Sequence, residues 1–103
     1  MSSAPTVVIG FSGSATIRQA DDVAHRLRQA LESSDRIEVD CSELDEVDVT
    51  FLQLILAAHK SAEADGKVLV LSSPAKGALL DAVAICGAEQ GIRADFWQAR
   101  GAF

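Results

Sequence analysis

The chain has 103 residues, of which 49 % are hydrophobic, so it is long enough for a modest core and too apolar to remain disordered. Fifteen Asp and Glu against nine Lys and Arg give a formal net charge of −6 at pH 7. This acidic balance, with the basic residues scattered singly, argues against a groove for nucleic acid or a surface for anionic membranes. We therefore expect one globular domain over residues 1–103.

The amino-terminal half is predicted to form a strand, a helix and a second strand. Thr6–Phe11 is apolar, rich in β-branched residues and followed by turn-forming residues, as is typical of a buried strand. Apolar residues recur at helical spacing over Gln19–Ser34, with carboxylates in the first turn that suit the helix dipole. Arg36–Cys41 alternates between polar and apolar residues and is predicted to be a strand, with Ser42–Asp48 as a connection.

The remaining elements repeat this order. Thr50–Gly66 is a second predicted helix, more apolar than the first, and Lys67–Ser73 is a nearly continuous apolar strand suited to the interior of a parallel sheet. Pro74 then opens a third predicted helix, Ala75–Gly87. The order β-α-β-α-β-α predicts a single compact α/β domain with a mostly parallel sheet and right-handed crossovers.

The cysteines and the acidic stretch of the chain do not indicate a metal site or a redox site. Cys41 and Cys86 lie far apart without a CxxC pattern, which indicates two buried, reduced thiols of a cytosolic protein. The acidic stretch Asp40–Asp48 does not match a calcium-binding loop, because its sixth residue is Asp45 rather than glycine and its twelfth is Phe51 rather than glutamate. We expect no metal and no cofactor.

Catalysis and membrane insertion are equally unsupported. Ser12 stands in GFSGS, which has serine where the last glycine of a nucleophile elbow belongs, and the glycines form no nucleotide-binding motif. The amino terminus lacks a basic segment followed by a long apolar core, so no signal peptide is expected. The longest apolar run, within Phe51–Ala58, is too short to cross a bilayer. We expect a protein that is not an enzyme and does not insert into a membrane.

One hydroxyl, Thr50, lies between the acidic stretch and the second predicted helix. Together with Asp48 it could cap that helix, since a side-chain oxygen there accepts a free backbone N–H. It could also be a phosphoacceptor, because a phosphate at a helix amino terminus meets free N–H groups and the positive end of the dipole. Both roles are compatible with the sequence.

The central part of the chain resembles the STAS domain, a family named for sulfate transporters and anti-sigma factor antagonists. The resemblance extends from VVIGFSGSATI to GALLDAVAICGAEQGI and includes SSPAKGALLDAV. Its centre is a set of short motifs in a fixed order: Val39-Asp40-Cys41-Ser42-Glu43-Leu44, Val47-Asp48, Val49-Thr50 and Leu52-Gln53-Leu54-Ile55. The resemblance implies a sheet of four to five strands and a domain that works by binding proteins, not by catalysis.

In stand-alone bacterial members of the family, the domain binds a kinase-like anti-sigma factor and thereby frees a sigma factor for transcription. The resemblance implies the same kind of docking for this chain. Phosphorylation of the loop before the second helix abolishes that docking in the family. The corresponding loop here departs from the family pattern, since Val49 occupies the usual acceptor position and Phe51 the usual glycine. Thr50, one position along, becomes the candidate acceptor, and a binder without a phosphoswitch is the alternative.

The expected partner-binding residues surround this loop: Glu46, Asp48, Val49, Thr50, Phe51 and Gln53. A partly exposed Phe51 would be an apolar anchor within a polar rim. The expected partner is an anti-sigma factor or a histidine-kinase-like ATPase in the cytoplasm. The alternatives are an accessory subunit on the cytosolic side of an ABC-type lipid transporter and, ranked last, a small-ligand sensor. Monomer and dimer both stay open.

Two further residues carry expectations. His59 is predicted to lie with Lys60 on the solvated or partner-facing side of the second helix. Trp97, in the tail Ile92–Phe103, either packs over an edge of the core or, if exposed, helps to bind a partner.

Overall fold

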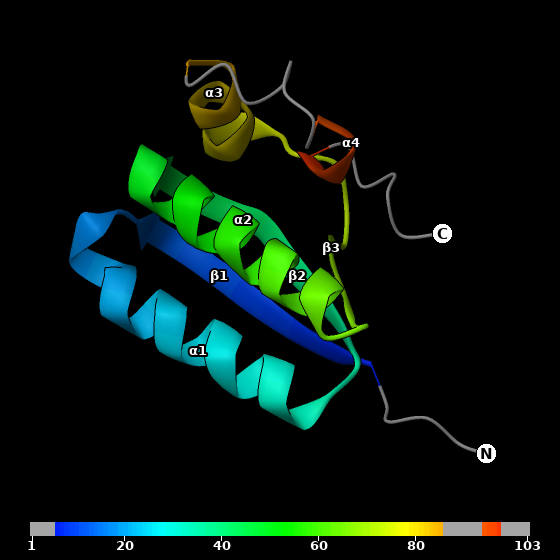
Figure 1. The fold of residues 1–103 in the computed structure, drawn as a ribbon. Helices are drawn as coiled ribbons and strands as arrows, with labels where there is room; N and C mark the ends of the chain where they lie inside the picture. Colours follow the sequence, from blue (N-terminus) through cyan, green and yellow to red (C-terminus); the bar gives the residue numbers. More distant parts are fainter. Residues whose placement is uncertain (1–5, 86–93, 98–103) are drawn as a thin grey trace.

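The computed structural model describes residues 6–85 and 94–97. The described elements follow the predicted alternation of strands and helices (Figure 1). They are β1 (Val7–Ala15), the 3-10 turn η1 (Ile17–Gln19), α1 (Ala20–Ser33), β2 (Arg36–Val47), α2 (Val49–Ala64), β3 (Val68–Leu71), α3 (Gly77–Ile85) and α4 (Ala94–Trp97). The α/β architecture expected from the sequence is therefore confirmed.

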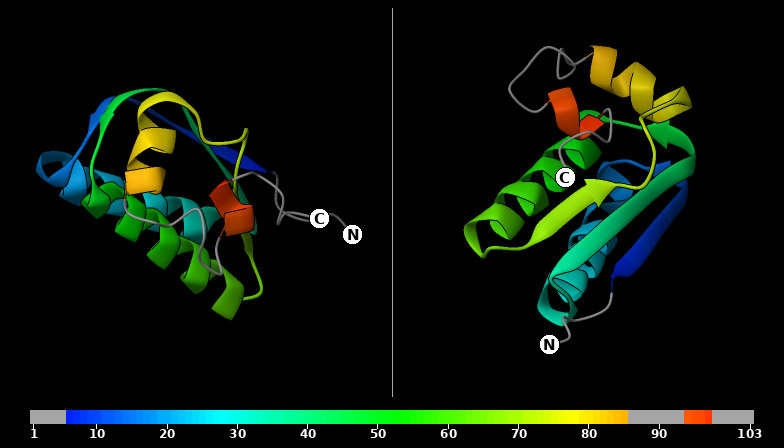
Figure 2. Two further views of the ribbon diagram at one scale, coloured as in Figure 1. Left: turned by 90° about the horizontal axis from the view of Figure 1, so that it is seen from above. Right: turned by 90° about the vertical axis from the view of Figure 1, so that its right-hand side faces the viewer.

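The described strands form one three-stranded parallel sheet in the order β1-β2-β3. Ile9 pairs with Val39 and Ile37 with Leu69, so apolar side chains share one face of the sheet. Helices α1 and α2 lie side by side on that face (Figure 2), as two successive right-handed crossovers in the same direction require. The sheet of four to five strands remains an expectation, since the described residues contribute three.

Most of the core lies between this face of the sheet and the two helices, and α3 adds Leu79, Ala82 and Val83 to it. Ile37 and Val39 are fully buried. The helix residues that meet them follow the helical period, which explains why the sequence pattern located both helices. These residues are Val23, Leu27 and Ala30 of α1, and Phe51, Leu52, Ile55, Ala58 and Ala62 of α2.

Strands β1 and β2 are longer than the sequence pattern indicates. The expected connection Ser42–Asp48 belongs, up to Val47, to β2, where it pairs with residues 12–15 of β1. The pairing contains irregularities on either side of Gly13, whose φ of 69° places it in the left-handed region that glycine tolerates. These irregularities break the two-residue alternation of side chains, so the sequence shows no strand pattern there although the backbone pairing continues.

The carboxyl-terminal part also differs from expectation in its bounds. Helix α3 begins at Gly77, three residues after Pro74, and Cys86 and Gly87, expected at its end, lie outside the described residues. Phe96 and Trp97 of α4 are buried beside β3. Within residues 6–85 and 94–97, the structure contains no helix with the length and apolar character needed to cross a membrane.

Candidate functional site

The residue that organises the carboxyl end of the sheet is Asp48. It is the N-cap of α2, and its Oδ1 accepts a hydrogen bond from the backbone N–H of Phe51 at 3.3 Å. Its Oδ2 accepts from the backbone N–H of Ile17 at 2.9 Å, and its own N–H donates to the carbonyl of Ala15 at 3.4 Å. One carboxylate therefore holds the β1–α1 turn against the first turn of α2.

Neighbouring side chains reinforce this arrangement. Ser14 donates a hydrogen bond to Glu46 at 2.8 Å, which links the ends of β1 and β2. Thr16 and Gln19 form a capping box that closes the 3-10 turn. A cavity of about 400 Å³ lies between the turn and the end of β2, with Arg18 among its lining residues. Side-chain hydrogen bonds thus hold the 3-10 turn and the first turn of α2, and the ends of β1 and β2 are joined through their side chains.

Two apolar side chains are exposed on this ordered scaffold. Val49, the first residue of α2, is 48 % exposed, and Ile17 of the adjacent turn is 70 % exposed. Glu43, Asp45 and Glu46 at the end of β2 are also exposed. We call Ile17, Glu46, Asp48, Val49 and Thr50 the α2 docking surface. It combines a small apolar centre with a rim that is mainly acidic and includes the exposed Arg18.

The remaining predicted binding residues separate into exposed and buried groups. Gln53 is exposed, and Thr50, the second residue of α2, is half-buried. The cap of α2 comes from Asp48 rather than Thr50, so the hydroxyl is not the N-cap acceptor. A phosphate on Thr50 would lie in the first turn of α2, at the positive end of the dipole and near the N-cap carboxylate of Asp48.

The condition under which Phe51 would anchor a partner, partial exposure of its ring, is not met. Phe51 is 1 % exposed, and its ring packs edge-on against Phe11 of β1 with 5.5 Å between ring centroids. The first turn of α2 lies over the sheet, so its third residue points into the core while its first points outward. Phe51 therefore supports the surface from beneath, and Ile17 and Val49 are the apolar side chains exposed to solvent here.

Ile17 is the binding candidate that the sequence did not reveal. It lies between the predicted strand and helix, where a single apolar residue has no periodic neighbours. The only available signal was a large aliphatic side chain between Thr16 and Arg18 in a predicted turn. Its position beside α2 depends on the long-range hydrogen bond to Asp48, which sequence periodicity does not report.

His59 does not lie on a solvated face. Its side chain is 14 % exposed, its Nδ1 is 2.9 Å from the carbonyl oxygen of Leu69, and its ring packs on Phe96 at 4.9 Å between centroids. Its Nε2 lies 3.6 Å from Glu63 one turn along the helix. Because β3 and α4 cover this side of α2, His59 joins elements of the core, and the expectation that it faces a partner is wrong. Lys60 is exposed, as expected.

The thiol of Cys41 is poorly suited to chemistry. Burial and the neighbouring charge of Asp40 raise its pKa to about 12, so it stays protonated and unreactive at neutral pH. Two hydrogen bonds from Ser42 and the charge of Lys76 lower the pKa of the exposed Asp40. The described part of the chain holds no cluster of three or more His, Cys, Asp or Glu arranged to bind a metal ion.

Trp97 is 2 % exposed, and its backbone carbonyl accepts a hydrogen bond from the N–H of Ala75 at 2.8 Å. Of the two roles open for this residue, packing over an edge of the core is therefore the one the structure supports.

Comparison with protein families and known structures agrees with this architecture. The family model described as "Mlab, STAS domain" matches residues 2–94. The sequence has no significant match among curated proteins. The unphosphorylated form of the anti-sigma factor antagonist SpoIIAA is similar in structure, with a TM-score of 0.64, 18 % identity, and coverage of 87 % of this chain and 77 % of that chain. A sulfate transporter family protein from Wolinella succinogenes gives a TM-score of 0.66 and 18 % identity over 88 % of this chain and 74 % of that chain.

Proposed function

The chain belongs to the STAS domain family, and from this we propose that it is a non-enzymatic protein-interaction module of bacterial signalling, an anti-sigma factor antagonist or a kinase-linked adaptor in the cytoplasm. The observation that carries the proposal is the α2 docking surface. There, Ile17 and Val49 are exposed on a backbone that Asp48 holds in place. A preorganised surface loses little conformational entropy when it binds.

The chemistry of the surface indicates the character of the partner. An apolar centre that becomes buried within a charged rim is a common arrangement for protein recognition. The rim here is mainly acidic: Glu46 borders it, and Glu43 and Asp45 precede Glu46 in β2. Arg18 adds one basic residue to it. A partner with a shallow apolar recess surrounded by Lys and Arg would complement it. We propose a histidine-kinase-like ATPase, such as an anti-sigma factor, in that role.

We propose further that Thr50 is the residue through which a kinase controls docking. Phosphorylation would add about two negative charges beside an already acidic rim, and would thus oppose a basic partner. The half-buried Thr50 lies next to the exposed Val49, so a phosphate on it would project into the contact region. If Thr50→Ala leaves both partner binding and phosphate incorporation unchanged, this switch does not exist.

A second candidate is an accessory subunit on the ATPase of an ABC-type lipid transporter. The similar fold of a sulfate transporter family protein supports keeping this candidate, since the same architecture also occurs in a transport context. In that role the α2 docking surface would be a permanent contact and Thr50 would need no kinase.

The deciding experiment is capture of partners on the immobilised chain from a lysate of its native organism, with identification by mass spectrometry. A kinase-like ATPase or an anti-sigma factor is the expected result, whereas a transporter ATPase with its permease would assign the second function. Val49→Lys should abolish capture. Leu80→Lys is the matched control, because Leu80 is 42 % exposed on α3, outside this surface, and its replacement should retain capture. Equal capture by both variants would refute the surface assignment.

A further inference from the structure

The outer edge of β1 is unusual for a strand at the margin of a sheet. Within the described residues, β1 pairs only with β2, so the other side of this nine-residue strand has no strand partner. The carbonyl of Gly10 is occupied by Arg26, and the stretch before it, residues 7–9, has no such side-chain cover from the described part of the chain. Edge strands are commonly protected by charged residues or proline, and β1 contains neither. The opposite edge, β3, has only four residues. The β1 edge is therefore the long, uncharged margin of the sheet.

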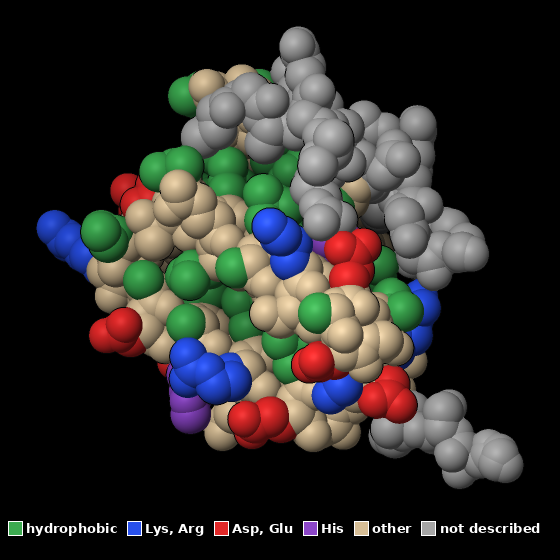
Figure 3. All heavy atoms as spheres, in the orientation of Figure 1, with side chains coloured by type: hydrophobic (Ala, Val, Ile, Leu, Met, Phe, Trp, Pro, Cys, Tyr) green, Lys and Arg blue, Asp and Glu red, His purple; other side chains and the backbone are tan. Residues whose placement is uncertain are grey.

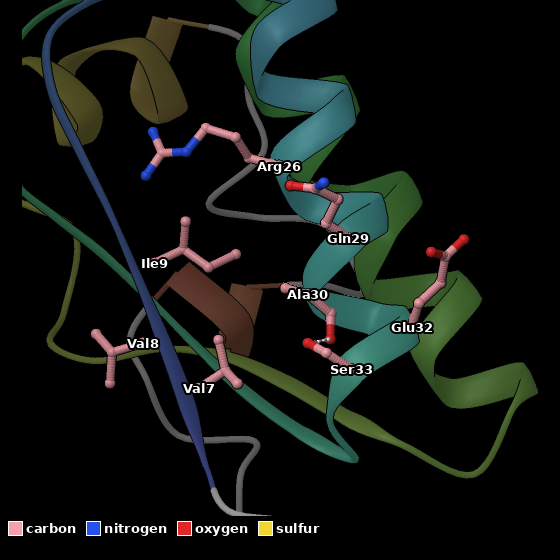
Figure 4. A pocket seen from close by; sticks show the side chains of 8 residues that line it. All are labelled: Val7, Val8, Ile9, Arg26, Gln29, Ala30, Glu32 and Ser33. Carbon is pink, nitrogen blue, oxygen red and sulfur yellow. Dashed lines mark hydrogen bonds between the residues drawn. The ribbon is translucent and has the colours of Figure 1, made fainter.

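A groove accompanies this edge. It has a volume of about 580 Å³ and lies between the first half of β1 and helix α1 (Figure 4). Val8, which lines it, is 61 % exposed, the largest exposed fraction recorded for an apolar side chain in the sheet. The groove ends at Arg26, whose guanidinium donates a hydrogen bond to the carbonyl of Gly10 at 2.7 Å and lies 4.6 Å from the ring centroid of Phe11.

The charges along the groove have a self-complementary order. Arg26 lies at one end and Glu32 lines the other, six residues further along α1, which corresponds to about 9 Å of helix. The strand between them is uncharged. A two-fold axis near Val8 would reverse one copy against another and would bring Arg26 of each copy opposite Glu32 of the other. Such an arrangement is an isologous interface.

We propose that the chain forms a homodimer in which the β1 strands of two copies pair antiparallel along their outer edges. The paired segment is residues 7–9, the part of β1 that lines the groove. The two sheets then become one continuous sheet, in which the outward backbone groups of residues 7–9 in each copy pair with those of the other copy. A second copy is the occupant that the charge order favours, because each copy supplies both the cation and the anion that the other needs. The carboxyl ends of β1 and β2, and with them the α2 docking surface, stay free, so this proposal does not depend on the proposed function.

The test measures the mass of the full chain in solution by sedimentation velocity over a wide range of concentration. The wild type should be a dimer. Val8→Lys, which places two like charges at the two-fold axis, should raise the dissociation constant by roughly tenfold or more. Its circular dichroism should stay native, since Val8 is exposed. Val49→Lys, an equal change at the other end of the sheet, should dimerise as the wild type does.

A charge exchange tests the symmetry. Arg26→Glu and Glu32→Lys should each weaken the dimer, and the double variant should recover a large part of the lost affinity. A wild type that is monomeric throughout, a dimer indifferent to Val8→Lys, or a double variant no better than the weaker single variant would each overturn the proposal. Capture of a different protein that depends on Val8, by a chain that stays monomeric, would also overturn it.

Discussion

The two ends of the sheet are completed in opposite ways. At the carboxyl ends of β1 and β2, side chains satisfy the backbone: Asp48 accepts from two N–H groups, and Gln19 accepts from the N–H of Thr16. At the amino end of β1, the described chain leaves the strand edge open beside a groove. The first end has its shape before a partner arrives, whereas the second has hydrogen-bonding capacity that a partner can fill.

This difference separates two modes of recognition. The carboxyl end offers side chains, and the proposed function assigns its specificity to Ile17, Val49 and the charged rim. The amino end offers backbone N–H and C=O groups of β1 to a second strand. Such pairing gives affinity with little dependence on sequence, and it needs a complementary strand. The two proposals therefore place contacts of different chemistry at separate positions on one small domain. The following substitutions test how independent the ends are, beginning with the largest expected effect.

Phe51→Ala should destabilise the whole domain. Removal of a fully buried ring leaves a cavity against Phe11 and should lower the free energy of unfolding by about 3–5 kcal/mol. Urea denaturation followed by circular dichroism measures this loss. Phe51→Leu, which retains part of the volume, should cost clearly less. If Phe51→Ala has the same free energy of unfolding as the wild type, packing of this ring does not stabilise the carboxyl end of the sheet.

Asp48→Ala should loosen the carboxyl end while the fold persists. Loss of the N-cap is expected to cost about 1–2 kcal/mol, because two backbone N–H groups lose their acceptor. Asp48→Asn should cost less, since an amide oxygen can still cap α2. Hydrogen exchange should show faster exchange at Ile17 and Phe51 and no change along the first half of β1. Faster exchange at both ends would show that the ends are coupled.

Ile17→Ser should leave stability almost unchanged, within about 0.5 kcal/mol, because the side chain is largely exposed and its backbone bond to Asp48 remains. Partner capture is expected to weaken nonetheless. Thermal unfolding and capture, measured on the same preparation, check the two parts. A stability loss comparable to that of Asp48→Ala would assign Ile17 a packing role in place of a binding role.

The sequence predicted the order of the elements because each regular element has a periodic apolar face. Ile37 and Val39 alternate with polar residues, and Leu27 and Ala30 recur at helical spacing. The sequence pattern did not predict the second half of β2. The irregular pairing with β1 around Gly13 removes the regular alternation of side chains there. Local patterns therefore determined where elements begin more reliably than where they end.

The candidate site was predicted only in part, for a related reason. The stretch around Asp48 was located from local chemistry, namely carboxylates and a hydroxyl before an apolar helix. The exposure of each residue there depends on contacts distant in sequence: Phe51 is buried by Phe11, and His59 by β3 and α4. Neither contact leaves a periodic signal near the residue that it buries.

The burial of Trp97 also gives this protein an intrinsic optical reporter. It is the only tryptophan of the chain, it is 2 % exposed, and its indole N–H has no hydrogen-bond partner in the described structure. Fluorescence from such an apolar, unbonded indole should be blue-shifted and should move to the red when α4 leaves β3. Emission from the unlabelled protein can therefore follow release of this helix in real time.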